Sequence, residues 1–352
     1  MKKKYILMLG PSIENRGGMA QSEKVLLENW KSDLFSIKHI VDHKDGYAFK
    51  KILTFLLAII QFLYFLVVKH PVIIYALMSV SASFYRKSIF ILIAKLFNKK
   101  VVINSRGGDF NSFYNDSPVI IKRYIKWILK LPDLNIVLGE KQKELFNQIS
   151  GHSRCKVIHN SIQCPIDPRP FDTKPMVVCT MSHLSQAKGT FDLLEAIPEI
   201  LIEFPHLEFW LCGDGDFKKI QDIIMSKRLE TNVKLLGYVD ERKKRKVFLS
   251  SSIFVLPSYF EGMPRCLLEA MSYSLPVVTT RVDGIPELVE DGVTGILIEP
   301  GDINALAYKI ITLLKEDRIR NEMGRNARLS VQTNFNVDAK LAELETEFMK
   351  LV

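Results

Sequence analysis

The chain has 352 residues, of which 47% are hydrophobic and 25% charged, so it is long enough for two domains with buried cores and too apolar for a disordered protein. Five scattered cysteines without a C-x-x-C pair argue against a disulfide framework and favour reduced thiols in a cytoplasmic protein. Residues 1–170 carry 26 Lys and Arg against 12 Asp and Glu, whereas the rest of the chain carries 22 against 27. The first half is therefore expected to face an anionic partner: phosphate, anionic lipid or nucleic acid.

The N-terminal apolar run, Tyr5–Leu9, meets Gly10 and Pro11 and lacks a small-residue cleavage site. A run this short is typical of a buried first strand rather than a signal peptide, and we expect no export. Similar runs alternate with amphipathic stretches along the chain, which predicts parallel sheets with helices on both faces. The predicted strands are Tyr5–Leu9, Val72–Ala76, Val101–Asn104, Asn135–Leu138, Lys156–Ile158, Met176–Met181, Glu208–Cys212, Val233–Leu236, Ile253–Leu256, Val277–Thr279 and Gly295–Ile298.

A segment with four prolines in twelve residues, Cys164–Pro175, separates the first five predicted strands from the other six. Because proline interrupts helices and interior strands, this segment is predicted to link two domains. The first domain is expected at residues 1–165 and the second at residues 166–330.

The stretch Ile52–Val68 has seventeen residues without a charge and is flanked by Lys50, Lys51 and Lys69. It lies where a crossover helix of the first sheet belongs, and its length is at the lower limit for a membrane span. Three interpretations are open: a buried crossover helix, a helix packed on the sheet that also presents apolar surface to a bilayer, and a true span. We favour the second, because the next helical pattern, Phe84–Phe97, places basic residues beside an apolar face, as anionic lipid head groups require.

The clearest chemical signal follows the predicted strand that ends at Leu256. There Glu261 and Glu269 are eight residues apart, and Gly262 and Pro264 mark a turn between them. A strand–loop–helix corner presents backbone N–H groups that suit an anionic phosphate. If the helix reaches back to Glu261, the two carboxylates lie about two and a quarter turns apart on one side of it. One carboxylate can then approach a sugar while the other accepts hydrogen bonds from a ribose diol.

This E-x7-E pattern resembles the donor site of retaining glycosyltransferases of the glycosyl transferases group 1 family. Other motifs resemble the family in the same order along nearly the whole chain. They are the Gly-Gly segment Arg16–Ala20, Ser182–Gly189, Leu211–Gly215 and Pro276–Gly295. The resemblance implies an α/β fold of the GT-B architecture, in which two Rossmann-like domains face a cleft. It also implies a C-terminal helix, within residues 331–352, that packs back on the first domain.

The resemblance further implies roles for individual residues. Glu261 is expected beside the donor sugar, Glu269 at the ribose, and Lys188 at the departing diphosphate, where negative charge builds. His183 stands where the family usually has Arg, so its contact is weaker or depends on protonation; the plainer role for it and for Lys188 is solvation or capping. The other donor-binding residues are expected in two turns, at Gly17 and Gly18 and at Gly262, Met263 and Pro264.

On the acceptor side, relatives commonly carry a His-Gly pair, and this chain has Arg106 where that His stands. Because Arg remains protonated, Arg106 is expected to grip a phosphate of donor or acceptor, and Asp109 becomes the candidate base. The plainer alternative is a salt bridge between the two. Asn160 resembles a structural turn of the family. The D-x-D pattern at Asp214–Asp216 is interpreted as a strand-ending turn, and because the family works without a bound metal, no metal or other cofactor is expected.

Together these features predict a retaining glycosyltransferase that moves a sugar from a nucleotide-sugar donor to a polyprenyl-diphosphate-linked glycan or another glycolipid. The expected process is polysaccharide assembly at a bacterial cell surface, with Glu261, Asp109 and Arg106 as catalytic residues. The first domain is expected to bind the acceptor at the anionic, cytoplasmic face of the cell membrane, and the second to bind the donor.

Two alternatives to this enzyme are open. Because Arg106 and His183 depart from the family pattern, the chain can be a catalytically inactive relative. The basic first half also allows a membrane- or nucleic-acid-binding module. Nucleic acid is disfavoured as a partner, because the basic residues are not interleaved with aromatic residues on a recognised binding fold.

Overall fold

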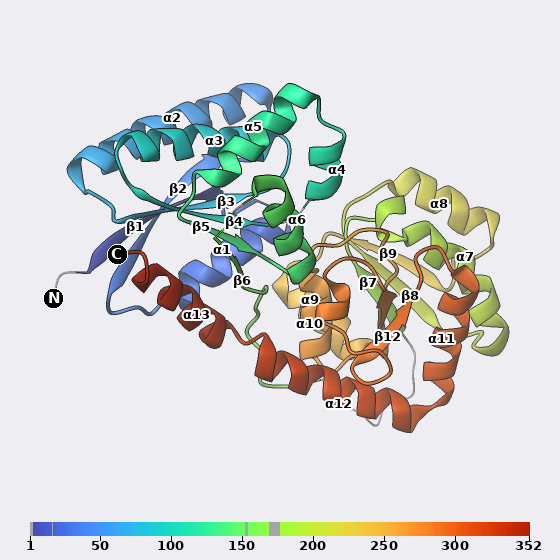
Figure 1. Ribbon diagram of the computed structural model, residues 1–352. Coiled ribbons are helices and arrows are strands. Elements are labelled where there is room, and N and C mark those ends of the chain that lie inside the picture. The colour runs from blue at the N-terminus through green and yellow to red at the C-terminus, as the bar shows by residue number, and fades with distance from the viewer. Residues whose placement is uncertain (1–2, 16, 107, 152–153, 169–176) are drawn as a thin grey trace. The chain divides into compact units, whose positions relative to one another are not determined.

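The computed structural model describes residues 3–15, 17–106, 108–151, 154–168 and 177–352. The chain forms two compact units, one made of Met1–Ser161 with Val337–Val352 and one of Ile162–Asn336. Each unit holds a six-stranded sheet whose strand pairs are all parallel, with helices on its faces (Figure 1). The predicted α/β class with two Rossmann-like sheets is confirmed. Residues 169–175 of the predicted linker, and Met176 of a predicted strand, lie outside the described residues.

The first unit has strand order β2-β1-β3-β4-β5-β6. Its strands are β1 (Lys4–Pro11), β2 (Phe35–His43), β3 (Ile73–Met78), β4 (Lys100–Ser105), β5 (Leu134–Val137) and β6 (Cys155–Val157). Its helices are α1 (Gly18–Asn29), α2 (Ala48–Val68), α3 (Ala82–Leu96), α4 (Phe110–Asn115), α5 (Val119–Lys130), α6 (Glu140–Ser150) and α13 (Val337–Met349). One face of this sheet packs against α2, α3, α5 and α6, and the other packs against α1 and α13.

The second unit has strand order β12-β11-β10-β7-β8-β9. Its strands are β7 (Val177–Met181), β8 (Glu208–Cys212), β9 (Val233–Gly237), β10 (Ile253–Leu256), β11 (Val277–Thr280) and β12 (Gly295–Ile298). Its helices are η1 (Gln186–Lys188), α7 (Thr190–Glu203), α8 (Phe217–Ser226), α9 (Glu241–Ser250), α10 (Arg265–Ser272), η2 (Ile285–Glu287), α11 (Ile303–Lys315) and α12 (Asp317–Asn334). In chain order this is the 3-2-1-4-5-6 arrangement of Rossmann sheets, which bind ligands at the carboxyl ends of the strands where the order reverses. Here those strands are β7 and β10.

Strand β2 is absent from the predicted strands. It lies at the edge of the first sheet, where it pairs with β1. Its sequence, FSIKHIVDH, mixes apolar residues with Lys38, His39 and Asp42, and only three of its nine residues are buried. An edge strand that is not buried on both faces lacks the continuous apolar run that marks the interior strands.

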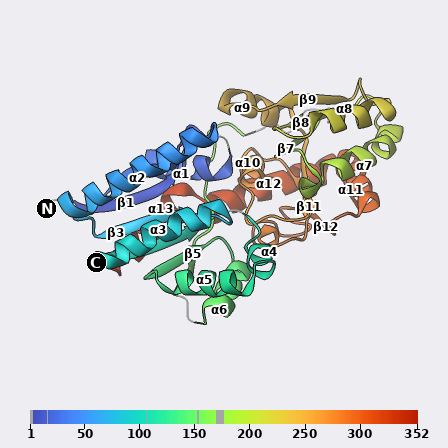
Figure 2. The same cartoon turned by 90° about the horizontal axis from the view of Figure 1, so that it is seen from above.

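Helix α2 packs on the first sheet through a narrow stripe. Ala58, Phe62 and Leu66 are buried in this stripe, and the Phe62 ring lies 5.1 Å from that of Phe90 on α3. Phe55, Ile59 and Phe65 are half-buried at the edges of the stripe. Ten other large apolar side chains of the helix are exposed: Phe49, Ile52, Leu53, Leu56, Leu57, Ile60, Leu63, Tyr64, Val67 and Val68. Within the described part of the chain, α2 is the one helix long and apolar enough to cross a membrane. Its exposure disagrees with a fully buried crossover helix, and Figure 2 shows α2 lying alongside α3.

Candidate functional site

The loops that follow β7 and β10 carry most of the predicted donor-binding residues. Lys188 lies after β7 and Glu261 after β10, so both stand at the carboxyl ends where the strand order of the second sheet reverses. Between these loops, Gly189 has φ +65°, and a Cβ atom there would lie 2.0 Å from the carbonyl oxygen of Pro257. Only glycine permits this approach, which brings together two motifs more than seventy residues apart in sequence.

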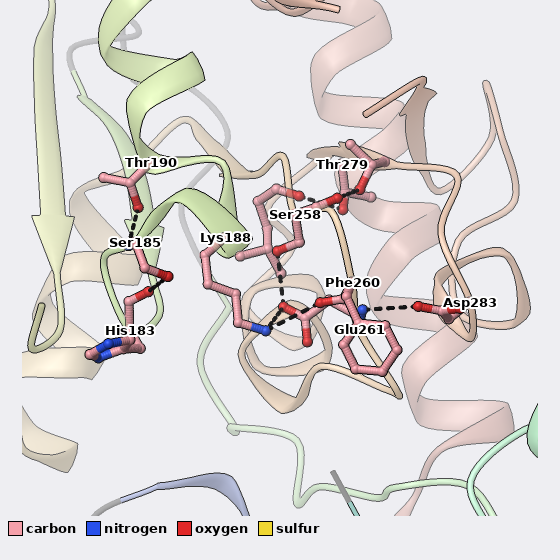
Figure 3. A network of polar contacts seen from close by, with 11 residues as sticks. His183, Ser185, Lys188, Thr190, Ser258, Phe260, Glu261, Thr279 and Asp283 are labelled. Atoms are coloured by element: carbon pink, nitrogen blue, oxygen red, sulfur yellow. Dashed lines mark hydrogen bonds and ion pairs between the residues drawn. The ribbon is translucent and has the colours of Figure 1, made fainter. Parts of the chain in front are cut away.

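Lys188 and Glu261 form an ion pair within the second unit (Figure 3). The Lys188 ammonium lies 2.7 Å from Oε1 of Glu261 and also donates to the carbonyl of Phe260 at 3.4 Å. The Ser258 hydroxyl donates to the same carboxylate oxygen at 3.0 Å. The two charged side chains are only 25% and 11% exposed, so the pair is shielded from solvent. A lysine and a carboxylate are therefore held in contact at the place where this fold binds ligands.

The backbone around Glu261 is fixed by a neighbouring loop. The Glu261 N–H donates to Oδ2 of Asp283 at 3.2 Å, and the Gly284 N–H donates to the Glu261 carbonyl at 3.4 Å. A Cβ atom on Gly284 would lie 1.9 Å from the carbonyl oxygen of Gly262, so this loop also depends on a glycine. Ser258 and Asp283 were not among the predicted site residues, although both lie in the motif segments that carried the resemblance.

The second motif glutamate, Glu269, lies on helix α10, which does not include Glu261. Helix α10 begins at Arg265, after a Pro264 N-cap, so the condition for a shared helical face, a helix that reaches back to Glu261, is not met. The residue before a proline avoids the helical conformation, which favours a helix start at this point. Glu261, Gly262, Met263 and Pro264 form the loop before it, whereas Glu269 lies within the helix. The two glutamates therefore occupy different elements rather than one helical face.

Glu269 contacts Lys244 from helix α9. The Lys244 ammonium lies 3.1 Å from Oε1 of Glu269 and 2.9 Å from Oε1 of Glu241. Burial alone would lower the pKa of Lys244, but the carboxylates of Glu269 and Glu241 outweigh it, and the pKa is raised. Lys244 was not predicted from the sequence, because it is one of five basic residues in six within α9 and nothing local singles it out.

His183, the remaining predicted donor residue after β7, is exposed and lies apart from the ion pair in Figure 3. Its carbonyl oxygen accepts a hydrogen bond from the Ser185 hydroxyl at 3.2 Å. Asp216, of the D-x-D pattern, caps helix α8 by accepting from the Lys219 N–H. Within the described ranges, no group of three or more His, Cys, Asp or Glu side chains could hold a metal ion.

In the first unit, the Gly-Gly turn follows β1 at the point where that sheet reverses its strand order. Gly17 is the N-cap of α1 with φ +114°, and Gly18 is its first residue. A side chain at Gly17 would be strained by this backbone conformation, whereas open space surrounds the Cβ positions of both glycines. The turn therefore offers backbone N–H groups at a helix start, an arrangement that suits an anion.

Arg106 and Asp109 each have their own partners. The Arg106 guanidinium donates from Nε to Oδ1 of Asn104 at 3.1 Å and from Nη1 to the Asn160 side chain. Asp109 is the N-cap of α4, where it accepts from the Ser112 N–H at 2.9 Å and from the Ser112 hydroxyl. The plainer alternative of an Arg106–Asp109 salt bridge disagrees with these contacts. Asp109 performs the capping role that its position before a helix provides.

A buried carboxyl group near Gly10 was missed by the sequence analysis. Glu23 on α1 is fully buried, and neither of its carboxyl oxygens has a hydrogen-bond partner among the described residues. Its Oε2 lies 3.7 Å from Nε2 of His39, and a Cβ atom on Gly10 would lie 1.4 Å from its Oε1. Burial raises the pKa of Glu23 to about 9, although Lys87 opposes the shift. Burial also lowers the pKa of His39, so both groups are neutral at pH 7.

These two Rossmann-like units define the chain as a protein of the GT-B architecture. The structure of HepE from Anabaena in complex with UDP superposes on 98% of this chain and 100% of its own, with a TM-score of 0.78 at 20% sequence identity. At 20% sequence identity, this structural similarity shows a shared fold and nothing about activity.

A further similarity comes from sequence comparison. Residues 166–330 match the family model of the glycosyl transferases group 1. N-acetyl-alpha-D-glucosaminyl L-malate synthase of Bacillus anthracis is 32% identical over 171 residues, which cover 48% of this chain and 44% of that protein. The amylovoran biosynthesis glycosyltransferase AmsK of Erwinia amylovora is 31% identical over 219 residues, covering 55% and 53%. The matched segments thus span about half of each relative. The similarity to the glycosyl transferases group 1 family thus covers most of the second unit.

Proposed function

We propose that this chain is a retaining glycosyltransferase that takes its sugar from a nucleotide-sugar donor. The observation that carries the proposal is the Lys188–Glu261 ion pair at the carboxyl ends of β7 and β10, where a Rossmann sheet binds nucleotides. The match of residues 166–330 to the family model supports sugar transfer, and the UDP bound by HepE supports a nucleotide diphosphate as the carrier.

The donor is bound by the second unit in this proposal. Glu261 accepts hydrogen bonds from hydroxyls of the donor sugar, and Glu269 accepts them from the ribose diol. Lys188 supplies positive charge to the diphosphate, and backbone N–H groups come from Gly262 and Met263 in the loop and from the first turn of α10, which follows the Pro264 N-cap. As the bond between the anomeric carbon and the phosphate oxygen breaks, this charge stabilises the departing nucleoside diphosphate. No metal is needed for that step.

The acceptor hydroxyl forms the new bond in the same step. Its oxygen bonds to the anomeric carbon on the face that the nucleotide leaves, and its proton passes to the departing phosphate oxygen. The configuration is retained, as the family resemblance implies. Asp109 is not needed as a base in this scheme, in keeping with its contacts to Ser112 at the start of α4.

The acceptor is a polyprenyl-diphosphate-linked glycan or another glycolipid bound by the first unit. Arg106 suits the phosphate of such a lipid, because amide oxygens of Asn104 and Asn160 orient the guanidinium without neutralising its charge. Gly17 and Gly18 offer a second anion-binding turn. The process is polysaccharide assembly at the cell surface, supported by the relation to an amylovoran biosynthesis enzyme.

The first unit also lies on the cytoplasmic face of the membrane in this proposal, through one face of its sheet. The outer side of α2 is apolar, with Leu56 and Ile60 exposed by 51% and 64%, and α5 adds Trp127, exposed by 48%. Helices α2, α3 and α5 contain no Asp or Glu, whereas α6, which covers the same face of the sheet, carries Glu140 and Glu144. Exposed basic residues accompany them, among them Lys50, Lys51, Arg123, Lys126 and Lys130.

Surface contact is favoured over a span for α2. A spanning helix would have to take Ala58, Phe62 and Leu66 out of the core that the first sheet forms with α3. An apolar face with basic neighbours and no acidic residues is typical of a helix that lies in the interface of an anionic bilayer.

Transfer is tested with cell membranes and a panel of radiolabelled nucleotide sugars. The purified protein should move label from one donor into the organic extract. Glu261→Ala should lose this transfer, whereas Glu230→Ala, which changes an exposed glutamate of the same unit, should keep it. Label that remains in a water-soluble polymer would show that the acceptor is not a lipid of the membrane. Absence of transfer from any donor, with wild type equal to Glu261→Ala, would instead favour an inactive relative or a binding module.

Membrane contact is tested by flotation of the full chain with vesicles of 30% anionic phosphatidylglycerol and with purely zwitterionic vesicles. We expect binding to the anionic vesicles and a loss of at least about tenfold in partitioning for a Leu56→Ser, Leu57→Ser, Ile60→Ser variant, since about 1 kcal/mol or more is lost with each buried apolar side chain. Ile202→Ser on α7, exposed by 80%, is the matched control and should bind as wild type. If the wild-type protein stays fully soluble in the presence of anionic vesicles, the proposed membrane contact of the first unit is wrong.

A further inference from the structure

Lys244, the lysine that contacts Glu269, forms a shielded ion pair between two helices of the second unit. Lys244 and Glu269 come from two different helices, α9 and α10, and their side chains are 13% and 18% exposed. Surface ion pairs between long exposed side chains contribute little and are screened by salt. This pair is instead largely shielded from solvent, and it lies beside a residue of the E-x7-E motif.

Lys244 also holds a second carboxylate, that of Glu241. Oε1 of Glu241 lies 2.9 Å from the Lys244 ammonium and Oε1 of Glu269 lies 3.1 Å from it, so these two oxygens are at most 6.0 Å apart. Without the intervening cation, two carboxylates at this separation would repel each other and move apart. Lys244 therefore both neutralises Glu269 and limits where its carboxylate can lie.

The contact leaves Glu269 able to bind a ligand. A carboxylate has two oxygens and about four lone-pair sites, and Lys244 contacts Oε1. The opposite side of α10 is fixed in the core by Leu267, Leu268 and Met271, so the helix itself is held in place. Only the direction of the Glu269 side chain is left to be set, and Lys244 sets it.

We propose that Lys244 is a positioning residue that holds the Glu269 carboxylate in place for hydrogen bonds from the ribose hydroxyls of the donor nucleotide. The inference rests on the proposed donor site and deepens it. It assigns discrimination between ribonucleotides and deoxyribonucleotides to a lysine that does not itself touch the ligand. The adjacent Lys243, which is exposed on the same helix, has no such role.

The test compares the Kd values of UDP and 2′-deoxy-UDP, measured by calorimetry, with GDP and 2′-deoxy-GDP as the second pair. For the pair that the wild type binds, we expect the ribonucleotide to bind about tenfold or more tightly, as one hydrogen bond to a charged group provides. Lys244→Met should reduce this ratio to about threefold or less. Lys244→Arg should retain most of it, and Lys243→Met should match the wild type.

Two further measurements separate positioning from a merely structural role. In a Glu269→Gln background, Lys244→Met should change the ribose-to-deoxyribose ratio no further, because its effect passes through Glu269. With nucleotide sugar as substrate, Lys244→Met should raise KM more than it lowers kcat, because the ribose contact is made in both the ground state and the transition state. If Lys244→Met does not fold, Lys244→Gln provides the same loss of charge.

The outcomes distinguish this inference from the proposed function. A folded Lys244→Met protein that keeps the wild-type ratio would overturn the inference while leaving the glycosyltransferase intact, and so would a wild type that does not distinguish the two sugars. Failure of the wild type to bind any of the four nucleotides, together with absence of transfer from every nucleotide sugar of the panel, would overturn both.

Discussion

The two units cover their sheets with helices that differ in how much apolar surface they expose. In the second unit, α7 buries seven of its 14 residues, and its one large exposed apolar side chain is Ile202. In the first unit, α2 buries three of its 21 residues and exposes a continuous apolar outer side. Packing on a sheet requires only one stripe of a helix. The outer side of α2 therefore has no role in folding, which is why we assign it to a lipid surface.

The acidic residues of the two units differ in a related way. Glu261 and Glu269 in the second unit are each in contact with a lysine from another element. Glu23 in the first unit is fully buried without a hydrogen-bond partner among the described residues, and it stays protonated at neutral pH. The second unit therefore pairs its motif carboxylates with lysines, whereas the first keeps one carboxyl group neutral in its core.

The largest effect is expected where α2 meets the sheet. Phe62→Ala should lower the free energy of unfolding by about 3–5 kcal/mol, because it leaves a cavity in the core beneath the helix. Leu56→Ala, on the exposed side of the same helix, should change it by less than about 0.5 kcal/mol. Urea unfolding followed by tryptophan fluorescence measures both. Equal effects at the two positions would show that the outer side is also packed, and would break the comparison.

Removing the charge of Lys188 should have the next largest effect. Lys188→Met should reduce kcat for sugar transfer by about 10²–10³-fold, since one preorganised charge that stabilises a leaving group contributes this much. The matched control is Lys218→Met, at an exposed lysine of α8, which should leave transfer unchanged. Steady-state kinetics with the identified donor measure kcat for both variants. A decrease of less than tenfold for Lys188→Met would show that Lys188 does not stabilise the transition state.

A smaller, pH-dependent effect is expected from Glu23. Its folded pKa is about 9, above the ordinary value of 4.5, so the folded state retains a proton that the unfolded state has lost between those pH values. Stability should therefore fall as pH rises through this range, by up to about 1.4 kcal/mol per pH unit. Glu23→Gln should remove most of the decrease between pH 7 and 8.5, a window above the lowered pKa of His39.

Thermal unfolding at several pH values measures this dependence. Glu28→Gln, an exposed position on the same helix, serves as the control and should keep the wild-type slope. If Glu23→Gln also keeps that slope, Glu23 is ionised in the folded state and the contrast with Glu261 and Glu269 is lost.

The smallest effect is expected at Asp109. As the N-cap of α4, it should lose about 1 kcal/mol of stability on substitution by Ala and almost nothing on substitution by Asn, which also caps helices well. Asp109→Asn should also keep transfer activity. A decrease of about 10²-fold or more in the Asn variant would restore Asp109 as the base.

Much of the architecture was predictable from local sequence. Interior strands such as β3 and β10 are continuous apolar runs because both of their faces are buried, and turn residues separate them from amphipathic helices. The edge strand β2 escaped prediction for the converse reason. Glu261 and Glu269 were recognised from their spacing and from the motifs around them. Their spacing left open whether they share one helix, and the structure shows that α10 begins only after Pro264, so Glu261 lies outside it.

By itself, the sequence determined two α/β domains, the location of the Glu261 loop, and an apolar segment at Ile52–Val68. Only the tertiary structure decided which groups meet. The contacts of Glu261 with Lys188 and of Glu269 with Lys244 depend on the strand order of a sheet, which local patterns do not encode. The burial of Glu23 likewise depends on its packing against Gly10 on a neighbouring strand. The spacing of apolar residues in the local sequence determines whether a segment forms a helix or a strand. The pairing of distant elements determines which groups surround each site residue and how its side chain is oriented.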